Sequence, residues 1–296
     1  MSELWRLLAL LLILWLQSAA AAAVAVVDDS GARVALPEPA RRIVSLAPHA
    51  TELLLAAGAG GRVVGVVSHS DYPAAARALP QVGGYERLDL EAILGLAPDL
   101  VVAWESGNPG AEVERLRALG IPVYVTELRR LEDIPATLER IGILAGTPGE
   151  AGTAAAAFRD GVEALRRRYA GRSPVRVFYQ IWDSPLMTVG GDHLITSVIA
   201  LCGGRNIFAD QAALAPAVDV ESVLVRDPEA IVASGMAAER PEWLDGWRRW
   251  PGLGAVREEA LFLIHPDLIQ RPTPRILEGA EQLCADLDRV RARRGE

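Results

Sequence analysis

The chain has 296 residues, of which 51% are hydrophobic, 23% charged and 5% aromatic. Since domains average about 100–200 residues, this length predicts two domains or one large one, with a buried core. All 30 basic residues are arginine, against 38 acidic residues, and the net charge is −8. The acidic balance argues against nucleic acid or an anionic membrane as a partner, and the lack of lysine excludes Schiff-base chemistry.

The first residues have the pattern of a secretory signal peptide. Arg6 precedes an unbroken apolar run from Leu7 to Leu16, and small residues dominate from Gln17 to Ala25. A short apolar segment followed by a small-residue cleavage zone is typical of an export signal rather than of a membrane span. We therefore expect residues 1–23 to be a signal peptide, with an uncleaved membrane anchor as the alternative.

The next segment predicts a parallel α/β lobe. Residues 26–35 predict a hairpin with its turn at Ser30-Gly31, and a helix is predicted from Thr51 to Ala57. A further helix is predicted over 111–119. Short apolar runs predict strands at residues 43–46, 63–67, 100–103 and 123–125. Strands alternating with helices favour a parallel sheet.

A long helix then separates this series from a second one. From Glu150 to about Tyr169 the apolar residues follow a helical spacing, and Gly171 and Pro174 end the helix. Strands follow at 175–181, 230–233 and 261–264, with a final amphipathic helix at 276–291. Between them, Trp243, Trp247 and Trp250 recur at helical spacing, which predicts a stripe facing the core.

The two halves of the chain repeat each other. Residues 89–103 read DLEAILGLAPDLVVA and residues 219–233 read DVESVLVRDPEAIVA, so each predicts a short helix, a proline turn and a strand. Chance similarity between common α/β units is the alternative. We predict two Rossmann-like α/β lobes, residues 24–148 and 172–296, joined by one long helix at 149–171.

The two cysteines, Cys202 and Cys284, favour one disulfide in an exported chain, and two buried thiols are the alternative. Motifs for common enzymes are absent, including G-x-S-x-G, H-E-x-x-H, C-x-x-C and G-x-G-x-x-G. Polar and aromatic residues instead follow predicted strand ends, where ligands gather in open α/β sheets. They are His49, His69, Asp71, Tyr85, Trp104, Trp182, Met187, Asp267 and Arg271. Such aromatic planes suit a large flat ligand.

Several motifs, in order along the chain, resemble the periplasmic binding proteins that serve ABC importers of iron complexes and cobalamin. They are RIVSLAP at 42–48, SHSDYP at 68–73, PDLVVAW at 98–104, CGGRNIF at 202–208 and the segment from Arg271 to Cys284. The resemblance implies a class III fold with a rigid helix between the lobes and a disulfide joining Cys202 to Cys284. It also implies a periplasmic, monomeric receptor without enzymatic activity.

The resemblance also implies partners. The receptor would deliver its ligand to an ABC importer, a permease dimer with its ATPase. Glu91 and Glu221 would dock onto the permease, because they match the family's docking glutamates and coincide in the repeat. Cobalamin or a related corrinoid is expected as the transported ligand, without a resident cofactor.

The ligand residues implied by the resemblance are Pro48, His69, Tyr85, Trp104, Met187, Asp267 and Arg271. Trp104 matches a corrin-contacting tryptophan, whereas Tyr85 replaces a tryptophan, His69 a tyrosine, Met187 a phenylalanine and Ala215 a further tryptophan. This less aromatic pocket leaves heme and ferric siderophores as alternative ligands. Two other classes of protein, an exported enzyme and a metal-ion receptor, are further alternatives. No metal site is predicted, except that His69 is a candidate ligand to a metal centre.

Overall fold

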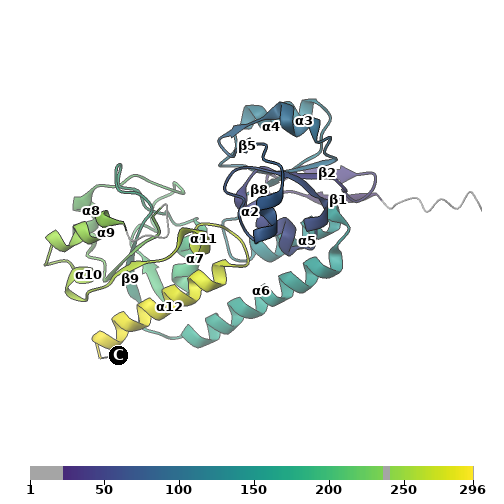
Figure 1. Ribbon diagram of the computed structural model, residues 1–296. Helices are drawn as coiled ribbons and strands as arrows, with labels where there is room; N and C mark the ends of the chain where they lie inside the picture. The colour runs from purple at the N-terminus through teal and green to yellow at the C-terminus, as the bar shows by residue number, and fades with distance from the viewer. Residues whose placement is uncertain (1–22, 236–240, 296) are drawn as a thin grey trace, which may run out of the picture.

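Two lobes lie side by side above one long helix in the computed structural model, which describes residues 23–235 and 241–295 (Figure 1). The predicted signal peptide, apart from Ala23, lies outside the described residues. None of the helices in the described ranges is long and apolar enough to cross a membrane.

The N-terminal lobe is built on a four-stranded parallel sheet with the order β4-β3-β7-β8. Its strands are β3 (Ile43–Ser45), β4 (Val63–Val66), β7 (Leu100–Trp104) and β8 (Val123–Thr126). The helices are α2 (Pro48–Ala56), α3 (Leu90–Gly95), α4 (Gly110–Ala118) and α5 (Asp133–Ala145), with short 3-10 turns at Gly60–Arg62 and Ala74–Ala78. The strands read as continuous apolar runs because helices cover both faces of the sheet.

Two small hairpins complete this lobe. The first pairs β1 (Val24–Val27) with β2 (Arg33–Leu36) in antiparallel fashion, which confirms the hairpin predicted at 26–35. The second pairs β5 (Gly83–Gly84) with β6 (Arg87–Leu88). Tyr85 lies at the turn of the second hairpin.

The C-terminal lobe contains the equivalent sheet, with the order β10-β9-β11-β12 and all neighbours parallel. Its strands are β9 (Val175–Gln180), β10 (Gly204–Asn206), β11 (Ala230–Ala233) and β12 (Leu261–Leu263). Its helices are α7 (Leu194–Leu201), α8 (Val220–Arg226), α9 (Glu242–Asp245), α10 (Gly254–Arg257), α11 (Pro266–Ile269) and α12 (Ile276–Arg293), with a 3-10 turn at Gly246–Arg249.

The equal strand order confirms that the sequence repeat reflects two related lobes. In each lobe the first strand is flanked by the second and third strands, and the fourth pairs with the third. The repeated segments form α3 with β7 and α8 with β11. Each helix begins at an aspartate, where Asp89 accepts a hydrogen bond from the Ala92 amide at 2.9 Å and Asp219 from the Ser222 amide at 2.6 Å. Both aspartates act as N-caps that satisfy a free donor of the first turn.

The long helix α6 (Pro148–Tyr169) joins the lobes, and at 22 residues it spans about 33 Å. It buries the stripe Ala151, Ala155, Phe158, Val162, Leu165 and Tyr169, whose alternating spacing of four and three residues keeps one face toward the core. This stripe belongs to a continuous apolar cluster that reaches from α2 in one lobe to α12 in the other. Gly161 allows α12 to approach, since a Cβ there would lie 2.5 Å from Leu277 Cδ1.

Several local features were not predicted or differ in detail. The 13-residue helix α5 and the short strand β10 were not predicted. The tryptophan stripe does pack on the core, with Trp247 buried and Trp243 and Trp250 partly buried. However, the backbone there changes from the short helix α9 to a 3-10 turn. The predicted disulfide is present, joining Cys202 at the end of α7 to Cys284 in α12 across a sequence separation of 82.

Candidate functional site

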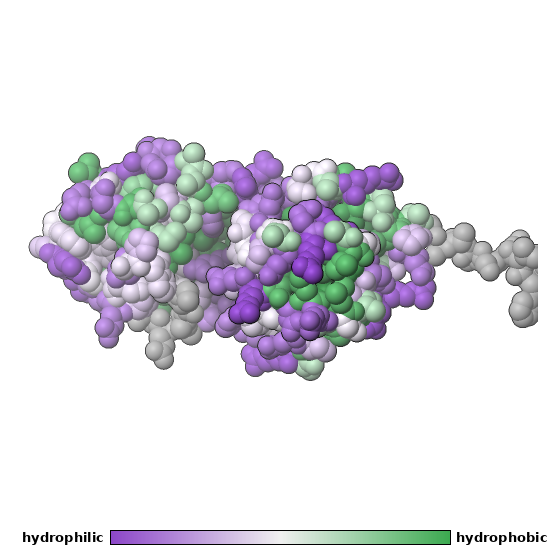
Figure 2. Space-filling model, turned by 90° about the horizontal axis from the view of Figure 1, so that it is seen from above, coloured by the Kyte–Doolittle hydropathy of each residue, from purple (hydrophilic) through white to green (hydrophobic). Residues whose placement is uncertain are grey.

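The loops that follow the parallel strands of both lobes meet at a cleft. A hollow of about 420 Å³ is lined from both sides, and a second of about 280 Å³ adjoins it, sharing Trp104, Gln270 and Pro272. Six of the seven predicted ligand residues line the larger hollow: Pro48, His69, Tyr85, Trp104, Asp267 and Arg271. The space-filling view from above shows the surface hollowed between the lobes, with apolar residues exposed on each (Figure 2).

Met187, the seventh predicted residue, lines neither hollow. It lies beyond β9, where it pairs with Trp182 and Ala217 in isolated bridges. Trp182 itself is 38% exposed, and its indole donates to the Ser184 carbonyl at 3.0 Å. Ala215, at which the resemblance implied a lost tryptophan, lines the smaller hollow.

An aromatic cluster forms the N-terminal wall of the cleft. The Trp104 ring lies 6.0 Å from the Tyr85 ring in a tilted arrangement and 5.3 Å from the His49 ring, edge to face. These separations are those of favourable aromatic pairs. The wall therefore presents an ordered aromatic surface to a ligand.

Asn108 holds this wall in place. Its buried side-chain amide donates to the Leu46 and Tyr85 carbonyls, both at 2.9 Å, and its oxygen accepts from the Trp104 amide at 2.7 Å. The neighbouring Gly107 makes room for the indole, because a Cβ there would lie 1.9 Å from Trp104 Cε3. Neither residue was predicted to shape the site.

His49 belongs to this aromatic wall and is itself buried, with Nε2 3.1 Å from the Thr126 hydroxyl. Burial lowers its pKa to about 3, and the positive charge of Arg271 acts in the same direction. His49 is therefore neutral at physiological pH. It supports Trp104 rather than carrying charge into the cleft.

Charged residues from both lobes form a second wall of the cleft, the charged wall. Arg271 reaches from the C-terminal lobe to the Glu52 and Asp71 carboxylates of the N-terminal lobe, both at 2.9 Å, and also contacts Asp267 at 2.9 Å. Burial opposes the ionisation of Asp71, but its hydrogen bond to Arg271 and the arginine's charge prevail and lower its pKa. The Arg271 guanidinium is thus held among three carboxylates.

A second arginine completes the contact between the lobes. Arg275 donates to both oxygens of Glu52, at 2.9 and 2.7 Å, and its guanidinium lies 3.7 Å above the Tyr72 ring. Glu52 is only 3% exposed, and burying a carboxylate without such partners would be costly in free energy. Nothing in the sequence indicated that Glu52 and Arg275 meet.

His69 lies in the loop after β4 and is exposed toward the hollow. Its backbone is left-handed, with φ of +64°, which is uncommon for a residue that has a Cβ. The Arg271 guanidinium donates to the His69 carbonyl at 3.3 Å. The charged wall therefore also fixes this turn.

A model of the periplasmic binding protein family matches residues 43–268. The chain is also 40% identical over 255 residues to the vitamin B12-binding protein of Vibrio cholerae serotype O1, covering 86% of this chain and 91% of that protein. The chain belongs to the periplasmic binding protein family. It is therefore a binding protein rather than an enzyme.

Solved structures agree with the two-lobed class III fold predicted for this periplasmic binding protein. The crystal structure of the periplasmic vitamin B12-binding protein BtuF of Vibrio cholerae has a TM-score of 0.78 at 38% identity, covering 86% of this chain and 98% of that one. The periplasmic heme-binding protein RhuT from Roseiflexus sp. RS-1, in its apo form, has a TM-score of 0.72 at 26% identity, covering 84% and 99%.

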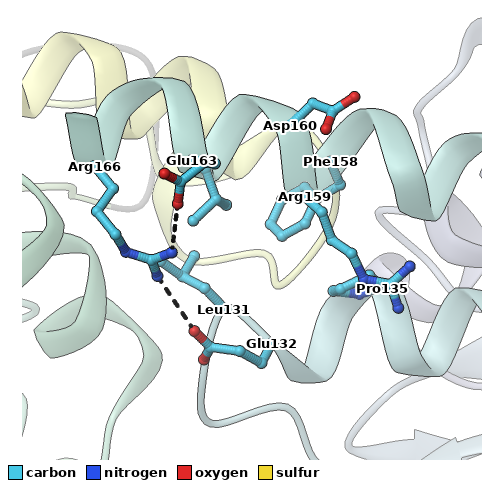
Figure 3. Close-up of a pocket in the computed structure, with 9 residues that line it drawn as sticks. Leu131, Glu132, Pro135, Phe158, Arg159, Asp160, Glu163 and Arg166 are labelled. Carbon is cyan, nitrogen blue, oxygen red and sulfur yellow. Dashed lines mark hydrogen bonds and ion pairs between the residues drawn. The ribbon is translucent and has the colours of Figure 1, made fainter. Parts of the chain in front are cut away.

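A further hollow of this binding protein, about 520 Å³, lies between α5 and α6, away from the cleft (Figure 3). Leu131, Pro135 and Phe158 line it. At its rim Arg166 pairs with Glu132 at 3.6 Å and with Glu163 at 3.0 Å. The charged side chains at this rim pair with one another in exposed ion pairs. None of the predicted site residues lines this hollow.

The two glutamates predicted to dock onto the permease occupy equivalent positions. Glu91 lies in the first turn of α3 and Glu221 in the first turn of α8, and both are exposed. Figure 1 shows both helices on the side of the binding protein away from α6. Each carboxylate also suits the positive end of its helix dipole.

Proposed function

We propose that this periplasmic binding protein captures cobalamin or a related corrinoid between its lobes and delivers it to the permease of an ABC importer. The observation that carries the proposal is that one cleft combines the aromatic wall, with Trp104 and Tyr85, and the charged wall, with Asp267 and Arg271. A flat macrocycle with polar side chains suits this combination, since its faces can stack while its rim accepts hydrogen bonds. The 40% identity to a vitamin B12-binding protein supports the same ligand.

The direct test is calorimetric titration of the mature protein with cyanocobalamin. We expect saturable heat with one ligand per chain, and a loss of affinity of about tenfold or more in Trp104→Ala, because that variant removes the main stacking surface. Trp250→Ala is a matched control, since Trp250 packs in the C-terminal lobe away from the cleft. Absence of heat and of any change in the cobalamin spectrum would exclude this ligand.

Heme is the second candidate, supported by the likeness to a heme-binding protein at 26% identity. Hemin added to the same preparation would then give a new Soret band, and cyanocobalamin would give no heat of binding. A ferric siderophore would instead depend on the arginines of the charged wall. The higher identity to the vitamin B12-binding protein favours the corrinoid over both.

Delivery is proposed to use Glu91 and Glu221 as contacts with arginine pockets on the permease dimer. Equivalent exposed carboxylates on two related lobes match a transporter with approximate two-fold symmetry. Exchanging both for arginine should leave corrinoid affinity unchanged and reduce uptake by cells that carry the cognate importer. Uptake equal to that of the unaltered protein would remove this part of the proposal.

Export is proposed to use residues 1–23 as a cleaved signal peptide. Mass spectrometry of protein recovered from the periplasmic fraction should give the mass of a chain that begins near residue 24. Recovery of the full-length chain in the membrane fraction would instead indicate a retained anchor.

A further inference from the structure

His69 differs from the other histidines in the availability of its ring nitrogens. His49 uses Nε2 toward Thr126, and His193 and His265 each use Nδ1 to accept a backbone amide at the start of a helix. A neutral imidazole that accepts through Nδ1 carries its proton on Nε2, which then has no lone pair for a metal. Within the described ranges, the only hydrogen bond of His69 is the one that its backbone carbonyl accepts from Arg271.

The backbone directs this free imidazole into the cleft. The left-handed turn at His69 is held by Arg271, and the residue lines the same hollow as Tyr85 and Trp104. A bulky residue kept in a sparsely populated conformation beside a ligand cleft indicates a functional position.

A single imidazole cannot hold a bare metal ion. The described residues contain no group of three or more His, Cys, Asp or Glu side chains that would do so. A tetrapyrrole-type macrocycle, however, supplies four equatorial nitrogens itself and leaves only the axial positions open. One uncommitted imidazole at the face of the ligand is sufficient for that geometry.

We propose that His69 supplies an axial nitrogen to the cobalt of a bound corrinoid whose axial ligand is exchangeable, and this inference rests on the proposed function. When that ligand is water, the lone pair of the neutral imidazole forms the cobalt–nitrogen bond and the water leaves to solvent. The cobalt keeps its oxidation state, and the imidazole keeps the proton on its other nitrogen. Cyanide is held much more strongly than water, so the receptor favours aquo-corrinoids over cyano-corrinoids.

The test compares aquocobalamin with cyanocobalamin on three proteins: the unaltered chain, His69→Asn and His265→Asn. Asparagine tolerates a left-handed backbone at position 69 and can accept the Asp267 amide at position 265, so each variant preserves its local structure. Visible spectra report axial exchange at cobalt. Calorimetry gives the ratio of the two affinities.

We expect the aquocobalamin spectrum to shift on binding to the unaltered chain and to His265→Asn, but not on binding to His69→Asn. The preference for aquocobalamin should be on the order of tenfold and fall toward one in His69→Asn. If cyanocobalamin binds but the aquocobalamin spectrum and the affinity ratio are the same in all three proteins, this inference is overturned and the proposed function stands. If neither corrinoid binds the unaltered chain, both are overturned.

Discussion

The Glu52 carboxylate accepts two hydrogen bonds from Arg275 across the boundary between the lobes, at 2.9 and 2.7 Å. Glu52 lies in α2 of the N-terminal lobe, and Arg275 immediately precedes α12 of the C-terminal lobe. Such a two-point geometry fixes orientation as well as distance. Together with α6, it ties the lobes at a second place and so fixes the opening of the cleft between them.

Replacing Arg275 by glutamine should destabilise the protein by about 2 kcal/mol. The buried Glu52 carboxylate would lose its two-point partner and keep only Arg271. Urea unfolding measures the change. Arg41→Gln is the matched control, because its ion pair with Glu38 is exposed and should contribute less than about 1 kcal/mol. Equal losses in both variants would contradict the importance of the contact between the lobes.

Replacing Gly107 by alanine should weaken corrinoid binding by about tenfold, because the added methyl group would displace the Trp104 ring. Calorimetric titration measures the affinity. Gly110→Ala adds the same methyl group at the start of α4, where no atom lies within 4 Å, and should leave affinity unchanged. An affinity for Gly107→Ala equal to that control would show that the ring position is unimportant.

Stability should fall as the pH is lowered from 6.5. Burial lowers the pKa of His49 to about 3 and that of His193 to about 4, from an ordinary value of 6.5. At pH values between the folded pKa and the ordinary pKa of each histidine, the unfolded chain binds a proton that the folded chain does not. Each histidine therefore lowers the free energy of unfolding by up to about 1.4 kcal/mol for each pH unit of acidification. The loss of stability due to each histidine ends as the pH falls below the pKa of that histidine in the folded protein.

Urea midpoints at pH 7.5 and 5.5 measure this dependence. His49→Gln keeps a polar group near Thr126 but cannot titrate, and it should show a smaller decrease between the two pH values. A decrease as large as that of the unaltered protein would mean that His49 does not contribute.

Removing the disulfide should destabilise the protein by roughly 4 kcal/mol, since the bridge closes a long loop in the unfolded chain. The variant with both Cys202 and Cys284 replaced by alanine should therefore unfold at lower urea concentration. The unaltered protein measured with and without reductant provides the comparison. A reductant-insensitive midpoint in the unaltered protein would contradict a stabilising bridge.

Much of the fold was predictable because its signals are local. Apolar runs marked the central strands, and the repeated segments around Leu100 and Ala230 indicated two lobes with the same plan. The helix α5 was not predicted, because its internal Pro135 and its position between a strand and the long helix obscured the periodicity. The strand β10 is short and contains glycine, which weakens the strand signal.

The site was predictable only in part. The residues beyond strand ends could be found, because parallel strands place their following loops at one edge. The contact between Glu52 and Arg275 could not be found, since it joins residues far apart in the sequence through tertiary structure alone. Likewise, the tie from Asn108 to both Tyr85 and Leu46 depends on the path of three separate loops.

The last helix, α12, lies close to α6 and carries the C-terminus to the end of the molecule remote from the N-terminal lobe (Figure 1). A fluorescent protein or an affinity tag fused after this helix would project from the side opposite α3 and α8. Surface immobilisation through such a tag would leave the cleft and both glutamate-bearing helices open to solution. Ligand capture and the proposed transfer to a permease can therefore be followed on the same immobilised receptor.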